Sequence, residues 1–167
     1  MPPRIRARRA LGAAGLLAAL GAVIGTPAEA QLAGGDSVRF RNPPTLPPAR
    51  GYSQLVEVPA GHRLVYLSGQ VALDSAGRLV GPGDLRAQTR QTFENLRRAL
   101  AAVGATFADV VKLSYYVVDA SQVAVIREER DRVVNVAAPP ASTLVEVRRL
   151  FRDDLLIEIE AVAVLGR

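Results

Sequence analysis

The sequence contains no cysteine, and this absence excludes several kinds of chemistry. Without a thiol the chain forms no disulfide, performs no thiolate catalysis, holds no metal through sulfur and has no lipobox cysteine for lipid attachment. Histidine is almost as scarce: His62 is the only one in 167 residues, so a metal site built from several histidines is excluded too. The sequence therefore predicts no metal site, and nothing in it indicates a cofactor.

Lysine is nearly absent, and the positive charge is concentrated at the start of the chain. The sequence has 21 Lys and Arg against 16 Asp and Glu, a net charge of +5. Residues 1–30 hold four of the arginines and one of the glutamates, so the rest of the chain has 17 against 15 and a net charge of only +2. No basic stripe interleaved with aromatic residues remains, so we do not predict nucleic-acid binding.

Residues 1–30 resemble a secretory signal peptide. Four early arginines precede an apolar stretch at 10–25, and Ala28-Glu29-Ala30 offers a small-x-small cleavage site. The apolar stretch is shorter than the roughly 20 residues of a membrane-spanning helix, so we favour cleavage over anchoring. Arg8-Arg9 partly matches a twin-arginine signal, which leaves both the Sec and the twin-arginine routes open. We expect a mature chain that begins at Gln31, is periplasmic or secreted, and has no membrane attachment.

The remaining sequence has the length of one domain. Residues 31–50 are rich in Gly and Pro and are expected to form an exposed, extended arm before a domain at 51–167. Hydrophobic periodicity predicts one helix at 84–104, capped by Asp84, and a second that starts at an Asp119–Gln122 capping box and runs to about residue 138. Strands are expected at about 52–58, 64–70, 109–118, 143–150 and 155–165, with a hairpin at 71–80.

This order of elements predicts an α+β fold, a single mixed β-sheet with two helices packed on one face. Two helices cover only one side of such a sheet. Because the strands are rich in Val and Ile, we expect the other face to be covered by further copies of the chain.

Several short motifs follow one another in an order that resembles the Rid family of enamine/imine deaminases. The resemblance spans residues 51–164. The motifs are Gly51-Tyr52-Ser53-Gln54, Leu67-Ser68-Gly69-Gln70, 91–96 with Asn95, Asp109-Val110-Val111-Lys112, Pro140-Ala141 with the strand after it, and Ile157-Glu158-Ile159-Glu160-Ala161. The resemblance implies a chorismate-mutase-like fold and a homotrimer, with the sheets forming an inner barrel and small-molecule pockets at the subunit interfaces.

The resemblance also implies roles for particular residues. Tyr52 matches a pocket-lining tyrosine, Ser68 and Gly69 match the pocket wall, and Glu158 matches the glutamate proposed to orient or activate the attacking water. A carboxylate in a partly apolar cleft has a raised pKa, which suits a general base near neutral pH. The alternation of polar and apolar residues around Glu158, taken alone, favours an ordinary solvent-facing strand residue.

Two positions depart from the family pattern. The arginine that holds the substrate carboxylate in the family corresponds to Ser142, which has no charge and no bidentate fork. The pocket-lining asparagine of the second helix corresponds to Arg127, and a tyrosine three residues on to Arg130. These arginines could belong to a solvated helix face, or Arg127 could bring the missing guanidinium into the pocket and bind carboxylates there.

Two functions therefore remain open at this stage. The first is an exported Rid-type hydrolase that converts an enamine or imine into a carbonyl compound and ammonia, with weak or no activity on 2-imino acids. The second is a non-catalytic trimer that binds a small metabolite, such as a keto acid, or a partner protein. A guanidinium beside Glu158 would favour the first.

Overall fold

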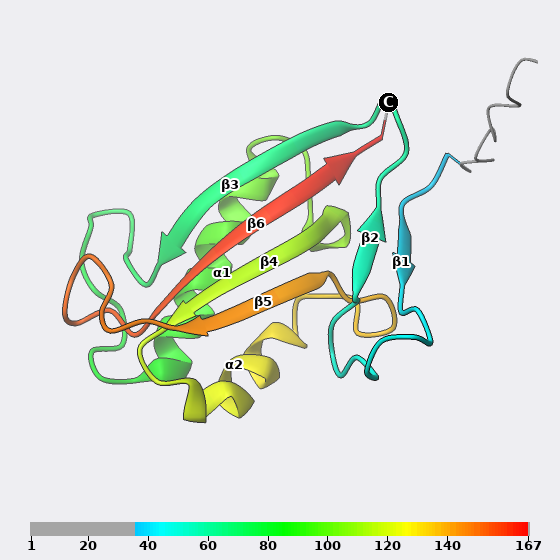
Figure 1. The fold of residues 1–167 in the computed structure, drawn as a ribbon. Coiled ribbons are helices and arrows are strands. Elements are labelled where there is room, and N and C mark those ends of the chain that lie inside the picture. Colours follow the sequence, from blue (N-terminus) through cyan, green and yellow to red (C-terminus); the bar gives the residue numbers. More distant parts are fainter. Residues whose placement is uncertain (1–35, 167) are drawn as a thin grey trace, which may run out of the picture. The chain divides into compact units, whose positions relative to one another are not determined.

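The computed structural model describes residues 36–166, so the expected signal peptide, its cleavage site and Gln31 lie outside the described residues. Its main sheet has four strands in the order β3 (Arg63–Val71), β6 (Ile157–Leu165), β4 (Val110–Val117) and β5 (Ala141–Glu146) (Figure 1). β6 runs antiparallel to both of its neighbours, whereas β4 and β5 are parallel. The predicted fold class, a mixed sheet with two helices packed on it, is confirmed.

Helix α1 (Leu85–Ala101) packs on the sheet by its apolar side, as its periodicity predicts (Figure 1). The helix begins after Asp84, whose carboxylate accepts a hydrogen bond from the Ala87 amide at 3.1 Å. Phe93, Leu96 and Leu100 are almost fully buried against the strands and supply the centre of the core.

Helix α2 (Val123–Arg130) is shorter than predicted. A 3₁₀ turn, η2 (Ala120–Gln122), precedes it, and the Asp119 side chain caps that turn by accepting from the Ser121 amide at 2.9 Å. The helix ends at Arg130, where the amides of Val133 and Val134 both donate to the Arg130 carbonyl and close a turn. Neighbouring β-branched residues favour helix weakly, which explains the early end.

Glu129 fixes α2 to α1. Its side chain is 1% exposed, and its carboxylate accepts from Arg86 at 2.7 Å and from the Arg90 Nε at 2.8 Å, both on α1. The Nε of Arg132 lies 3.2 Å from the same carboxylate. These charge-assisted hydrogen bonds, that of Arg90 first, hold the pKa of Glu129 below its usual range.

The segment before the main sheet is more ordered than the predicted extended arm. β1 (Arg39–Arg41) lies inside the expected arm and pairs antiparallel with β2 (Leu55–Glu57). β2 is shorter than the strand expected at 52–58. These two strands form a separate sheet (Figure 1). The proline-rich segment between them turns the chain back, so that Arg39–Arg41 comes alongside a strand far from it in sequence.

The expectation that Val and Ile fill the open sheet face holds only in part: Val145, Val162 and Val164 lie on that face, but the isoleucines do not. The isoleucines of β6, Ile157 and Ile159, are fully buried on the side that the helices cover. The open face carries mainly polar side chains from β4 and β6, namely Lys112, Ser114, Tyr116, Glu158 and Glu160.

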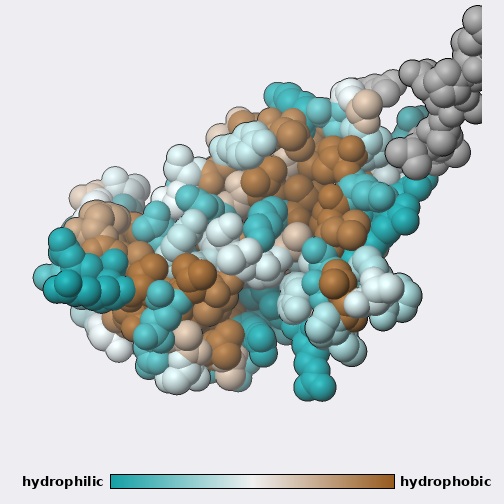
Figure 2. Space-filling model, viewed as in Figure 1, coloured by the Kyte–Doolittle hydropathy of each residue, from teal (hydrophilic) through white to brown (hydrophobic). Residues whose placement is uncertain are grey.

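The most exposed large hydrophobic side chains of the open face are Leu64 and Tyr66 on the edge strand β3, which are 45% and 75% exposed. Figure 2 looks onto this face and shows apolar patches between polar side chains. No helix within residues 36–166 has the length and apolarity needed to cross a membrane.

Candidate functional site

Three of the six predicted site residues meet in a small cavity of about 50 Å³ beneath α2, which we call the α2 cavity. They are Tyr52, Arg127 and Ser142. The remaining lining comes from the loop before β2, from α2 and from strands β4 and β5, and comprises Arg50, Tyr115, Val123, Ile126, Arg130 and Leu144.

Strand pairing explains why Ser142 lies under α2. In the parallel register Ser142 pairs with Leu113, and both face the helices, whereas the adjacent Thr143 faces the open side. Tyr52 reaches the same place because its neighbour Ser53 is tied to the chain just before β5. The Ser53 hydroxyl donates to the Pro139 carbonyl at 2.7 Å, and its amide donates to the Pro140 carbonyl at 3.2 Å.

The two arginines of α2 differ in their surroundings. Arg127 lines the cavity, is exposed, and has no hydrogen bond or ion pair from its side chain to any part of residues 36–166. Arg130 is 8% exposed and pairs with Asp131, and its guanidinium packs so closely over Gly51 that a Cβ there would lie 2.7 Å from Nη2. A solvated helix face, one of the two hypotheses for this pair, is therefore wrong for Arg130.

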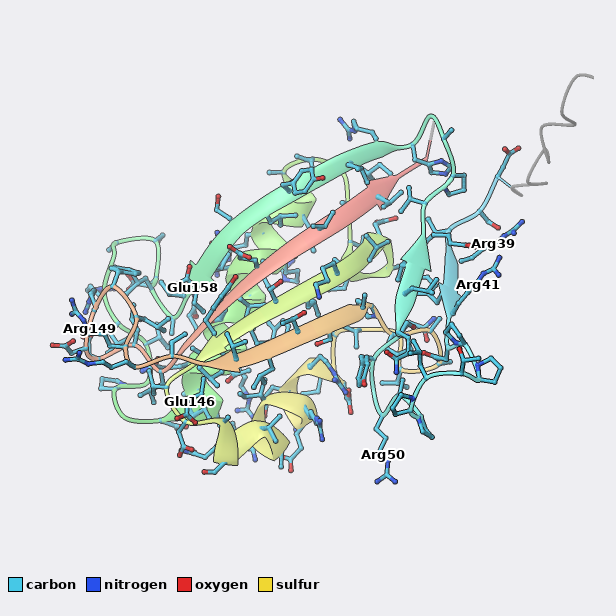
Figure 3. All side chains as sticks on the ribbon, in the orientation of Figure 1. Arg39, Arg41, Arg50, Glu146, Arg149 and Glu158 are labelled. Atoms are coloured by element: carbon cyan, nitrogen blue, oxygen red, sulfur yellow. The ribbon has the colours of Figure 1, made fainter. Side chains whose placement is uncertain are left out.

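Glu158 lies on the open face of the sheet (Figure 3), where its carboxylate packs closely against Gly69. β3 has an extra residue between Leu67 and Gln70, a bulge that brings the Gly69 backbone under the carboxylate. A Cβ on Gly69 would lie only 1.8 Å from Glu158 Oε1, so no larger residue fits while Glu158 keeps this conformation.

The Glu158 carboxylate is available for chemistry. Partial burial, and next the negative charge of Glu160, raise its pKa above the usual range. Its side chain forms no hydrogen bond or ion pair with the described part of the chain, whereas Glu160 accepts from the Tyr116 hydroxyl at 3.1 Å. A half-buried, unpaired carboxylate of raised pKa has the properties of a general base.

Ser68 also belongs to the open face, in a groove of about 240 Å³ that Lys112, Ser114 and Glu160 line as well. The sheet thus separates two groups of predicted site residues. Ser68, Gly69 and Glu158 lie on one side of it, and Tyr52, Arg127 and Ser142 lie on the other. One chain alone therefore does not place Arg127 beside Glu158.

Tyr115 and Arg130 are cavity residues to which sequence reasoning gave no role in the site. The alternation along β4 could have indicated that Tyr115 faces the helices, but not which residues of α2 and β5 surround it. Arg50 also borders the cavity, although its side chain extends away from the fold in Figure 3. No group of three or more His, Asp or Glu residues within 36–166 is placed to hold a metal ion.

This fold, with its two groups of polar residues on either side of a four-stranded sheet, is that of a known family. Residues 44–165 match the family described as "Endoribonuclease L-PSP". A solved structure of the Rid family, the protein YyfB of unknown function from Yersinia pestis, superimposes with a TM-score of 0.68 at 40% identity. The superposition covers 77% of this chain and 98% of that one. The chain belongs to the Rid family.

Two relatives are similar in sequence over most of the domain. Protein DfrA of Myxococcus xanthus is 40% identical over 113 residues, which cover 68% of this chain and 84% of that protein. The 2-iminobutanoate/2-iminopropanoate deaminase of Mus musculus is 38% identical over 116 residues, covering 69% and 82% respectively. One relative is thus named as a deaminase of two 2-imino acids.

Proposed function

We propose that this protein is an exported homotrimer that hydrolyses a small enamine or imine at sites formed between its subunits. The separation of the two residue groups by the sheet supports this proposal most directly. The α2 cavity of one copy could meet Gly69 and Glu158 only on another copy. Its volume of about 50 Å³ is also far below the roughly 300–1,000 Å³ of pockets that enclose a whole ligand.

The residues of the two groups suit two different parts of the reaction. Arg127, with Tyr52 and Ser142, would hold a carboxylate group of the substrate. Glu158 would take a proton from water as the water oxygen attacks the carbon of the C=N bond, and would pass that proton to the nitrogen. The hydroxyl proton of the resulting carbinolamine is then transferred to the same nitrogen, by way of Glu158, as the C–N bond breaks, so that ammonia leaves and a carbonyl compound remains.

The purified protein is expected to be a trimer at micromolar concentration. Leu64 and Tyr66, exposed at the β3 edge, are apolar surfaces that a neighbouring copy would cover. Light scattering with in-line chromatography measures this mass directly. A monomer would contradict both the shared site and the proposed function.

Arg127→Ala is expected to weaken the binding of small keto acids, which carry the carboxylate of the substrate, at least tenfold, about 1.4 kcal/mol. The reason is that Arg127 lines the α2 cavity with a guanidinium that has no partner in residues 36–166, whereas the side chain of Arg50, at the cavity border, extends away from the fold (Figure 3). Calorimetry with pyruvate and 2-oxobutanoate checks this, with Arg132→Ala as the control because Arg132 makes the same charge change without lining the cavity.

Equal affinities of the wild type and Arg127→Ala would refute a carboxylate role for Arg127. Tight binding of keto acids without any release of ammonia from imines would favour the second function, a non-catalytic metabolite-binding trimer.

A further inference from the structure

The hydroxyl of Tyr115 is buried without a partner. Tyr115 is 3% exposed, and its Oη forms no hydrogen bond with any group in residues 36–166. A buried phenol normally finds a hydrogen-bond partner, because an unsatisfied polar group in a protein interior lowers stability. The described fold therefore leaves the Tyr115 hydroxyl without the hydrogen bond that a buried phenol normally forms.

The surroundings of this hydroxyl indicate the charge of the missing partner. Tyr115 lines the α2 cavity together with Arg127, Arg130 and Ser142. The Nε and one Nη of Arg130 donate to Asp131, which leaves other guanidinium donors of Arg130 without a hydrogen bond in the described structure. Arg50 borders the cavity as well, so its arginines outnumber the one carboxylate paired with them, that of Asp131, and this excess of positive charge favours an anionic ligand.

The Tyr115 hydroxyl is available as a hydrogen-bond donor because it stays protonated. Burial raises the pKa of Tyr115, an effect that the nearby charge of Arg130 opposes and that of Asp131 reinforces. The hydroxyl therefore keeps its proton at any physiological pH. A protonated phenol that faces a positively charged cavity is able to donate to an anionic oxygen.

We propose that the Tyr115 hydroxyl is a ligand-binding group that donates a hydrogen bond to a carboxylate oxygen seated in the α2 cavity beside Arg127 and Arg130. This inference rests on the proposed function, since it names a further contact to the same carboxylate. It assigns recognition of the acid group to the helix side of the sheet, where a hydroxyl of β4 compensates in part for the uncharged Ser142 of β5.

The test is Tyr115→Phe, which removes one oxygen and changes little else. Because that oxygen makes no hydrogen bond within the described fold, the variant is expected to melt at the same temperature as the wild type or higher. Its affinity for pyruvate is expected to fall about tenfold, since the ligand then loses a buried donor. Calorimetry with pyruvate and thermal melts with and without pyruvate measure both quantities on the purified protein.

Thr92→Val is the matched control. Thr92 Oγ1 on α1 is the other buried side-chain atom without a hydrogen bond in residues 36–166, and it does not line the cavity. This variant is expected to bind pyruvate as the wild type does, so a loss confined to Tyr115→Phe identifies a contact with the ligand.

The outcomes separate the two proposals. If the wild type binds pyruvate and Tyr115→Phe binds it equally well, the role of Tyr115 is overturned and the proposed function stands. If the wild type binds no pyruvate, both are overturned. A lower melting temperature of Tyr115→Phe in the absence of pyruvate would show that the hydroxyl has a structural partner, and would also contradict the inference.

Discussion

Glu158→Gln is expected to lower the rate of ammonia release by about 10²–10⁴-fold and to leave the affinity for keto acids nearly unchanged. The amide keeps the shape of the side chain but cannot accept the proton of the attacking water. The affinity is retained because the residues proposed to hold the carboxylate lie on the other side of the sheet. Ammonia release from enzymatically generated 2-imino acids, together with calorimetry, measures the two effects. A variant that keeps the wild-type rate would exclude Glu158 as the base.

The pH profile supplies an independent check on the same carboxylate. A base must be deprotonated, so the rate is expected to fall as the pH drops through the raised pKa of Glu158. The charge of Glu160 contributes to that raised pKa, after burial. Glu160→Gln removes this charge, lowers the pKa of Glu158 and should move the acidic limb of the profile to lower pH. If the acidic limb of the pH profile does not shift in Glu160→Gln, a group other than Glu158 determines where the rate falls.

Moving one positive charge of the α2 cavity from position 127 on the helix to position 142 on β5 is expected to raise activity on 2-imino acids. The double variant Ser142→Arg with Arg127→Asn places the guanidinium on the strand, where the family resemblance expects it, and keeps the net charge. A charge-assisted bidentate contact contributes about 2–4 kcal/mol. Because Arg127→Asn gives up the contact of about 1.4 kcal/mol proposed for Arg127, the net gain is smaller, and we expect kcat/KM to rise at least about threefold in an ammonia-release assay.

The double change is needed because the cavity is already positively charged. Ser142 shares it with Arg50, Arg127 and Arg130, and a further guanidinium would be repelled there. Arg127→Asn alone is the control, and it should bind carboxylates less well than the wild type. A wild type that already turns over 2-imino acids rapidly, or a double variant no faster than it, would refute this account of Ser142.

The elements that could be predicted from the sequence are those specified by local signals. α1 has a capping aspartate and a regular apolar stripe, and the first half of β6 alternates Ile with Glu, so the sequence predicts both elements to within three residues. β1 was missed because its pairing with β2 depends on a proline-rich loop that brings together residues distant in sequence. Such pairing leaves no periodic signal in three residues.

The candidate site shows the same division between local and non-local information. Alternation along β6 indicates that Glu158 points away from Ile157, and it does. The face taken by Ser142 depends on the parallel register of β5 against β4, which no local pattern specifies. The sequence could therefore suggest residues for the site but not that the sheet divides them into two groups.

The contact between Gly69 and Glu158 has a consequence for how this sequence can vary. A side chain at position 69 would overlap the Cγ, Cδ and Oε1 atoms of Glu158, all of which lie within 3 Å of where its Cβ would be. The carboxylate would have to leave its place before the backbone could accept even a methyl group. Replacement of Gly69 during evolution therefore requires that the Glu158 side chain is first lost or moved. A residue other than glycine at position 69 of a related sequence would indicate that a glutamate no longer occupies this place.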